Sequence, residues 1–153
     1  MSELIQQLRQ YLPETQVITD ELRLLAYGTD ASFYRLTPQV IAVIESETEL
    51  QAVLKTAKQS NTPVTFRAAG TSLSGQAITD GILALIGEGF ATCDINADAS
   101  QVKVGPGIIG GEVNRRLAPF GKKIGPDPAS INACKIGGIA ANNASGMCCG
   151  TAQ

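Results

Sequence analysis

The sequence contains no histidine, and its four cysteines, at positions 93, 134, 148 and 149, form no Cys-x-x-Cys pair. An ordinary zinc site built from these two residue types is therefore not expected, and we predict no metal site. The 12 basic and 14 acidic side chains leave a formal net charge of −2 and are dispersed along the chain. No basic stripe is present, which argues against a nucleic-acid partner.

Long apolar runs are also missing from the sequence. No segment approaches the length that spans a bilayer, and the N-terminus lacks the basic and apolar regions of a signal peptide. Cysteines with no disulfide pattern fit a reducing compartment. We therefore expect a cytoplasmic protein, with peripheral attachment to the inner face of the membrane as the alternative. At 153 residues and 44% hydrophobic content, the chain can still bury a globular core.

A β-α-β unit is predicted near the middle of the chain. The run Val40-Ile41-Ala42-Val43-Ile44 is continuously apolar and rich in β-branched residues, which is typical of a strand buried on both faces. Residues 46–49, Ser-Glu-Thr-Glu, predict a capping box for a helix that ends near Asn61. Four residues are predicted on its inner face: Leu50, Val53, Leu54 and Ala57. A strand at 64–66 follows, parallel to the first.

Other elements are predicted on both sides of this unit. The N-terminal region should hold two helices, over 2–11 with Ser2 as its cap and over 19–28 with Thr19 as its cap. Further strands are predicted at 82–86 and 101–104. A last helix should run from Gly110 to about Phe120, with Val113 and Leu117 facing inward and Gly121 as its C-terminal stop.

A loop of small and hydroxylated residues follows the short apolar run at 63–66. Its sequence is RAAGTSLSG, residues 67–75. The glycines at 70 and 75 allow positive φ and a close approach of the backbone to a ligand, and Thr71 and Ser72 add hydroxyl donors. The loop therefore suits a phosphate. It has neither the Gly-Lys-Ser/Thr ending of a P-loop nor a Gly-x-Gly-x-x-Gly pattern, so the common nucleotide motifs do not apply.

Two downstream segments complete a more specific pattern. They are Gly125-Pro126-Asp127-Pro128-Ala129-Ser130 and the run IGGIAANNASG at 136–146. Together with the loop they resemble the FAD-linked oxidase family, whose PCMH-type cofactor domain is shared by vanillyl-alcohol oxidase and p-cresol methylhydroxylase. The likeness is to the D-lactate dehydrogenase and glycolate oxidase branch and extends over about residues 20 to 153.

This resemblance implies the fold and the domain organisation. We expect an α+β, α/β-like chain of two small βαβ-containing subdomains with FAD between them. Residues 1–35 would form an N-terminal helical segment, and residues 36–153 a PCMH-type FAD-binding domain that is incomplete at its C-terminus. Residues 147–153 interrupt the Asn-Ala-Ser-Gly run without a polar tail, so we interpret the chain as an N-terminal piece of a larger flavoenzyme.

The predicted FAD-binding residues lie in the three motif segments. In the loop they are Arg67, Ala68, Ala69, Gly70, Thr71, Ser72, Gly75 and Gln76. Downstream they are Pro126, Pro128, Ala129, Ser130, Gly137, Gly138, Ala141, Asn142, Asn143, Ser145 and Gly146. The two prolines suit a rigid wall against a flat ring system. Gly137 and Gly138 lie where a helix N-terminus could direct N–H groups at the pyrophosphate.

Two questions about this site are open at the level of sequence. Arg67 could bind phosphate as a bidentate partner, or it could brace the loop through an ion pair. The second question is how the flavin is attached. The wider superfamily often has a flavin-linked histidine where this chain has Thr71, and some relatives use a cysteine two residues before a Val-Gly pair. Cys134 is out of that register, so we predict non-covalent FAD.

The resemblance also implies an activity for the complete protein. It would be a flavin-dependent D-2-hydroxyacid dehydrogenase, in which a hydride passes from the substrate α-carbon to flavin N5. D-Lactate is favoured, with glycolate and 2-hydroxyglutarate as alternatives, and the sequence does not identify the electron acceptor. No residue of the chain is assigned a catalytic role. The chain alone is expected to be inactive and to self-associate, because a half-built site leaves apolar surface exposed.

Two other functions fit the same motifs. One is a non-catalytic FAD-binding subunit of a multi-subunit oxidase. The other is a reductase of cell-wall nucleotide-sugar synthesis, and the Asn-Ala-Ser-Gly segment argues against it.

Overall fold

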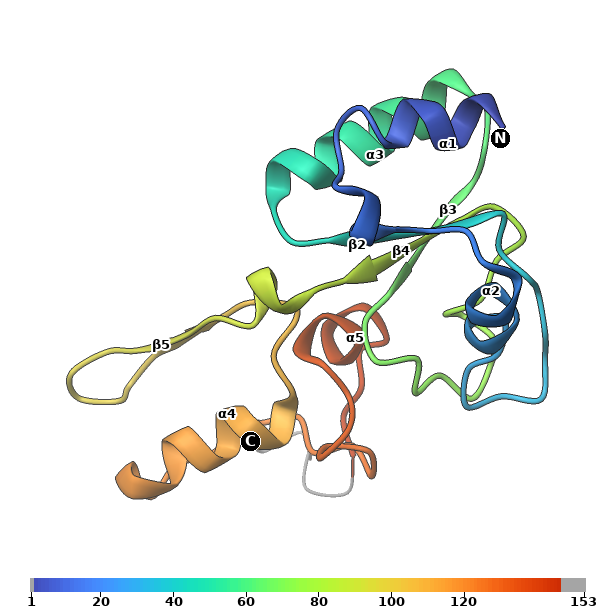
Figure 1. Cartoon of the computed structure of the whole chain (residues 1–153). Coiled ribbons are helices and arrows are strands. Elements are labelled where there is room, and N and C mark those ends of the chain that lie inside the picture. The colour runs from blue at the N-terminus through green and yellow to red at the C-terminus, as the bar shows by residue number, and fades with distance from the viewer. Residues whose placement is uncertain (1, 147–153) are drawn as a thin grey trace. The chain divides into compact units, whose positions relative to one another are not determined.

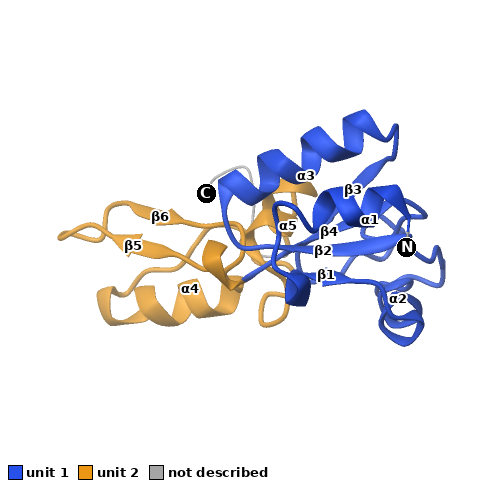
Figure 2. Ribbon diagram, turned by 45° about the horizontal axis from the view of Figure 1, so that its top comes forward, with its two compact units in different colours: residues 1–87 blue, residues 88–153 orange. Residues whose placement is uncertain are grey.

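The protein, seen here as a computed structural model that describes residues 2–146, consists of two compact units, Met1–Gly87 and Glu88–Gln153 (Figure 2). The prediction of a mixed α/β chain with two small subdomains is confirmed. Within the described residues, no helix is both long enough and apolar enough to cross a membrane.

A four-stranded sheet forms the centre of the first unit (Figure 1). Its strands, in spatial order, are β1 (Val17–Ile18), β2 (Val40–Ile44), β4 (Ile82–Ile86) and β3 (Val64–Arg67). β2 and β3 run parallel, as predicted, and β4, for which no direction was predicted, is parallel to both; β1 pairs antiparallel with β2. β4 lies between the two strands of the predicted β-α-β unit. Its sequence, ILALI, is apolar throughout and suits a central strand, whereas β3 carries Thr65 and Arg67 and lies at the edge.

Helices cover both faces of this sheet. α1 (Glu3–Leu8) and α3 (Glu47–Gln59) lie side by side over one face, and α2 (Glu21–Tyr27) lies over the other (Figure 1). Side chains alternate along a strand, so Ile41 of β2 and Leu83 of β4 share the α2 face, where Leu24 packs against them. This arrangement explains why the apolar runs of β2 and β4 are buried on both faces.

The two N-terminal helices differ in their ends from the prediction. α1 ends at Leu8, not at Tyr11, and the chain turns at 9–12 before Pro13. A short 3₁₀ turn, η1 (Glu14–Gln16), follows. The cap of α2 is Asp20, not Thr19: its carboxylate accepts a hydrogen bond from the N–H of Arg23 at 3.0 Å.

The start of α3 confirms the predicted cap and corrects the rest of the capping box. The Ser46 hydroxyl accepts the N–H of Glu49 at 3.3 Å. The Glu49 carboxylate accepts the N–H of Glu45 at 2.7 Å, so it does not return to Ser46. On the helix itself Leu54 is 42% exposed, contrary to the prediction, and Thr56 is buried in its place. Residues three and four positions after Val53 share its helix face, so Thr56 and Ala57 are buried with it. The next residue, Leu54, is rotated away from that face.

Ser46→Ala should lower the free energy of unfolding by about 1 kcal/mol, because it removes the side-chain acceptor for one N–H of the first turn. The shift of the urea midpoint measures this loss. Thr48→Ala, an exposed change in the same turn, is the control and should have a smaller effect. Equal shifts for the two variants would contradict the assigned cap.

The second unit is built on an antiparallel pair of short strands. β5 (Cys93–Ile95) pairs with β6 (Val102–Val104), after the short turn η2 (Glu88–Phe90). β5 was not expected from the sequence, and Gln101, expected at the start of the second strand, lies just before β6. The helices are α4 (Gly110–Leu117), which continues into η3 (Ala118–Phe120), and α5 (Ile136–Ala141). The core gathers around Ile108, Val113 and Leu117, and Gly121 ends the helical stretch with φ of 66° as predicted.

Candidate functional site

The loop after β3 has the backbone that the sequence predicts. Gly70 and Gly75 adopt φ of 71° and 73°, in the left-handed region that favours glycine. The Ser72 hydroxyl organises the second half of the loop, because it accepts the N–H groups of Ser74 at 3.1 Å and Gln76 at 3.2 Å and donates to the Gln76 side chain at 2.7 Å. Ser72 therefore has a role inside the loop that the sequence did not reveal.

Consecutive backbone donors remain available in this loop. Among the described residues, no group accepts a hydrogen bond from the N–H groups of residues 69–73. Residues 68–72 are half-buried. Successive N–H groups in a glycine-containing loop at the carboxyl end of a parallel strand can form a concave site for an anion. The geometry of the loop thus fits a phosphate group.

Arg67 braces the loop in this structure. Its Nη1 donates to the carbonyl oxygens of Thr29 at 2.7 Å, Tyr27 at 3.2 Å and Ala77 at 3.3 Å. The guanidinium also lies 5.3 Å from the ring centroid of Tyr27, within the range of a cation–π contact. Burial lowers the pKa of Arg67, and the nearby Asp30 opposes that shift. Of the two roles considered above, the observed contacts are those of the brace.

Asp30 is the residue beside this loop that sequence reasoning did not assign to it. Its carboxylate accepts the N–H of Ser32 at 2.9 Å and the N–H of Ala77 at 3.3 Å. Burial alone would raise the pKa of Asp30, but the hydrogen bonds from Ser32 and Ala77 and the charge of Arg67 outweigh it and lower the pKa. The sequence Asp-x-Ser at 30–32 is a local signal for a turn in which Asp30 accepts the N–H of Ser32. No local signal indicates that Asp30 also accepts the N–H of Ala77.

In the second unit, the structure brings the two downstream motif segments together. The N–H of Asp127 donates to the carbonyl of Ser145 at 2.7 Å, and Asp127 and Gly146 form a parallel bridge. Gly146 has φ of 89°, and a β-carbon there would collide with the carbonyl of Asp127. The predicted residues that are exposed in this unit are Ala129, Ala141, Asn142, Asn143, Ser145 and Gly146.

The start of α5 differs from what was predicted. The N–H groups of Ile136, Gly137 and Gly138 donate to the carbonyls of Ile108, Pro106 and Lys135 at 2.8, 2.9 and 3.0 Å. The physical reason for assigning Gly137 and Gly138 to the pyrophosphate is therefore wrong in this conformation, because their donors are already used within the protein. Gly137 is needed for packing instead: a β-carbon there would lie 2.8 Å from Cβ of Pro106.

The other predicted residues of this unit also have structural explanations. The carbonyl of Pro128 accepts the N–H of Ile131 at 2.9 Å, and the carbonyl of Ser130 accepts that of Cys134 at 2.8 Å, so the turn closes on itself. Asn143 follows α5 with φ of 46°, a left-handed conformation often found after a helix C-terminus. Cys148 and Cys149 lie outside the described residues.

Comparisons with known proteins agree with the motif pattern. A family model described as FAD binding domain matches residues 38–153. The chain is 31% identical over 145 residues to glycolate oxidase subunit GlcD of Escherichia coli (strain K12), an alignment that covers 93% of the chain and 29% of GlcD. It is 30% identical over 127 residues to D-2-hydroxyglutarate dehydrogenase of the same strain, covering 80% of the chain and 12% of that enzyme.

A third relative and two solved structures extend the comparison. D-lactate dehydrogenase of Archaeoglobus fulgidus is 28% identical over 130 residues, covering 78% of the chain and 29% of that protein. The fold matches alkyldihydroxyacetonephosphate synthase with a TM-score of 0.77 at 20% identity, over 94% of the chain and 32% of the synthase. It matches p-cresol methylhydroxylase with a TM-score of 0.75 at 14% identity, over 93% of the chain and 29% of the other.

The chain thus spans about three-tenths of the length of GlcD, and the family match takes in the loop, the Pro-Asp-Pro-Ala-Ser turn at 126–130 and the Asn-Ala-Ser-Gly run together. On this evidence the chain belongs to the FAD binding domain family.

Proposed function

We propose that this chain is the FAD-binding N-terminal part of a flavin-dependent dehydrogenase of D-2-hydroxy acids, with D-lactate as the preferred substrate and glycolate as the alternative. The observation that carries the proposal is the loop at 67–76, whose N–H groups at 69–73 have no acceptor among the described residues and suit a pyrophosphate. Relatives named for glycolate, D-2-hydroxyglutarate and D-lactate support the substrate class.

In this proposal, the residues of this chain bind the cofactor, and none of them is catalytic. Bound FAD supplies the hydride acceptor, and the protein positions it. Residues 68–72 and Gly75 would hold the pyrophosphate through their backbone, and the turn at 126–130 would contact the flavin. We propose that residues 36–153 make up this FAD-binding region and that residues 1–35 form a helical segment that precedes it.

Turnover tests the proposal. The complete gene product should reduce an artificial acceptor with D-lactate and more slowly with glycolate, and it should leave L-lactate unused. A FAD-loaded protein that oxidises none of these acids would favour the alternative, a non-catalytic FAD-binding subunit; the relative GlcD is itself named as a subunit.

Residues 1–153 alone should give no turnover with D-lactate. The sequence has no histidine to act as a base near neutral pH, and the lowered pKa of Asp30 makes its carboxylate a weak base. An acceptor-reduction assay, with a mock purification as the contamination control, measures this. Sustained turnover would overturn the proposal that no residue of this chain is catalytic and direct attention to Asp30, Tyr34 and Asp127 as candidate bases.

FAD should be held without a covalent bond. Position 71 is threonine, and Cys134 is only 4% exposed, so neither supplies an accessible nucleophile for the flavin. Acid precipitation of the yellow holoprotein should release the flavin into the supernatant, where its absorbance is measured. Flavin that stays with the pellet would contradict this prediction.

A further inference from the structure

The loop at 67–76 is closed by one side chain at its start. Arg67 is the last residue of β3, and Ala77 is buried just beyond the other end of the loop. The guanidinium donates to the carbonyl of Ala77 at 3.3 Å and to the carbonyl of Thr29 at 2.7 Å. A single group therefore fixes both ends of the loop and anchors them to the segment that follows α2.

Asp30 also binds Ala77, through the N–H of that residue. Its carboxylate accepts the N–H of Ala77 at 3.3 Å, while Arg67 binds the carbonyl of that residue. Both polar groups of Ala77 are thus satisfied by an oppositely charged pair, and Arg67 and Asp30 attract each other electrostatically. We call Arg67 and Asp30 together the loop brace.

The segment beside the brace also fixes the middle of the loop. The N–H of Ala31 donates to the carbonyl of Gly70 at 3.1 Å. In a trans peptide, the N–H points away from the carbonyl of the same unit, so this bond directs the N–H of Thr71 away from Ala31. Gly70 lies against the guanidinium, where an added β-carbon would overlap the side chain of Arg67.

We infer that Arg67 and Asp30 are positioning residues for FAD: the loop brace holds the N–H groups of residues 69–73 in the conformation that receives the pyrophosphate. This inference rests on the proposed function. It assigns Arg67 a role through the loop, whose N–H donors at 69–73 find no acceptor in residues 2–146, and not through direct contact with phosphate. A preformed loop binds more tightly because less conformational freedom is lost on binding.

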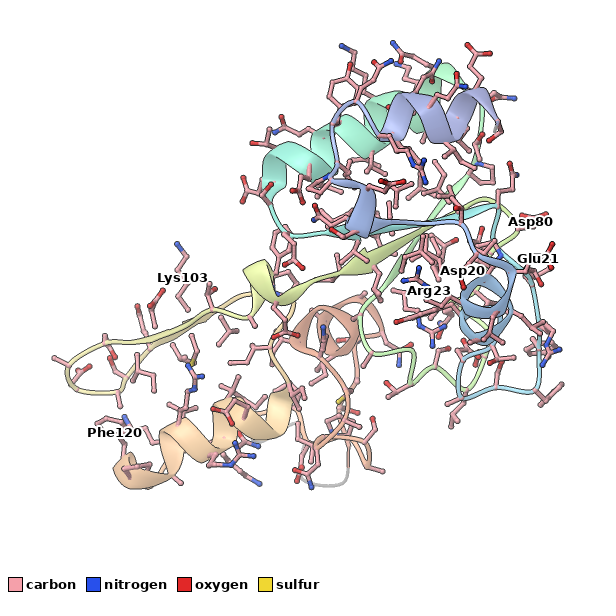
Figure 3. All side chains as sticks on the ribbon, in the orientation of Figure 1. Asp20, Glu21, Arg23, Asp80, Lys103 and Phe120 are labelled. Atoms are coloured by element: carbon pink, nitrogen blue, oxygen red, sulfur yellow. The ribbon has the colours of Figure 1, made fainter. Side chains whose placement is uncertain are left out.

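The test uses the complete gene product, stripped of FAD and titrated with FAD well below its melting temperature. Arg67→Lys keeps the charge, but its ammonium ends one bond short of the position of Nη1, which binds all three carbonyls. Asp30→Asn keeps one acceptor oxygen and replaces the other by an NH₂ group, so it cannot accept from both Ser32 and Ala77 through separate oxygens. Each variant should raise the Kd for FAD by at least about ten-fold. Asp20→Asn and Arg23→Lys are matched controls in the exposed pair at the start of α2 (Figure 3) and should leave the Kd within about two-fold.

Amide hydrogen exchange of the FAD-free protein separates positioning from other roles. The N–H groups of Ala31 and Ala77 should exchange faster in both brace variants, while Leu83 in the buried strand β4 should stay protected. A raised Kd with unchanged exchange at Ala31 and Ala77 would make Arg67 a direct ligand and overturn the inference. Faster exchange at Leu83 to the same degree would mean general destabilisation and would overturn it too.

The FAD titration also separates this inference from the proposed function. Normal FAD binding by the unaltered protein and an unchanged Kd in both brace variants would overturn the inference alone. Failure of the unaltered protein to bind FAD would overturn the proposed function and the inference with it.

Discussion

Gly70→Val should leave the protein without bound FAD. The wild-type residue has φ of 71°, and a side chain there would displace the guanidinium of Arg67, which three backbone carbonyls hold in place. Valine adds a branched side chain at a backbone conformation that costs a non-glycine residue about 1–3 kcal/mol. Because the donors at 69–73 depend on this conformation, we expect the Kd for FAD to rise by about 100-fold or more, equivalent to about 2.7 kcal/mol.

The control is Gly121→Val, which separates backbone strain from the loss of the loop. Gly121 has φ of 66°, close to that of Gly70, but within the described part of the chain no atom beyond its chain neighbours lies within 4 Å of the position a β-carbon would take. Both variants have a similar cost in backbone conformation, so both should lose some thermal stability. Their melting temperatures, compared with that of the unaltered protein, show whether each variant still folds. FAD content per protein should fall only in Gly70→Val. Normal FAD content in that variant, or equal loss in both, would show that the loop is not the pyrophosphate site.

The parallel strands were predictable because their signal is local. β2 at 40–44 and β4 at 82–86 were placed to the residue, since a continuous β-branched and apolar run is favourable only where both faces are covered. β1 is only two residues long, and its pairing with β2 defines it as a strand. β5 likewise depends on β6. Short strands of this kind carry little periodicity of their own, so the sequence could not reveal them.

In the candidate site, too, the local features could be predicted and the long-range contacts could not. The positive φ of Gly70 and Gly75 followed from residue type, since glycine adopts that region without a steric penalty. The loop brace could not be predicted from residue type, because Asp30 and Ala77 are 47 positions apart and no sequence pattern links them. The N–H of Gly137 was misjudged for a similar reason: its acceptor, the carbonyl of Pro106, belongs to another segment. Residue type predicts which backbone groups can bind a ligand, whereas the tertiary structure decides which of them are free.

Gly146→Val should separate the two motif segments of the second unit. A β-carbon at Gly146 would collide with the carbonyl of Asp127, which is backbone and cannot rotate away as a side chain does, and φ is 89°. The hydrogen bond from Asp127 to Ser145, now 2.7 Å, should break. Since both segments are proposed to contact FAD, the Kd for FAD should rise by at least about ten-fold, and the Asp127 amide should exchange faster.

The matched control for this variant is Gly125→Val, at the edge of the same turn. Among residues 2–146, no atom beyond its chain neighbours lies within 4 Å of a β-carbon at Gly125, and its φ is not positive. The residue before a proline favours an extended backbone, which a β-branched side chain tolerates well. Gly125→Val should therefore leave the Kd for FAD and the exchange rate of the Asp127 amide unchanged. Isothermal titration and amide exchange measure both quantities. If Gly146→Val retains normal FAD affinity although the Asp127 amide exchanges freely, the contact between the two segments supports the fold of this unit and not the cofactor.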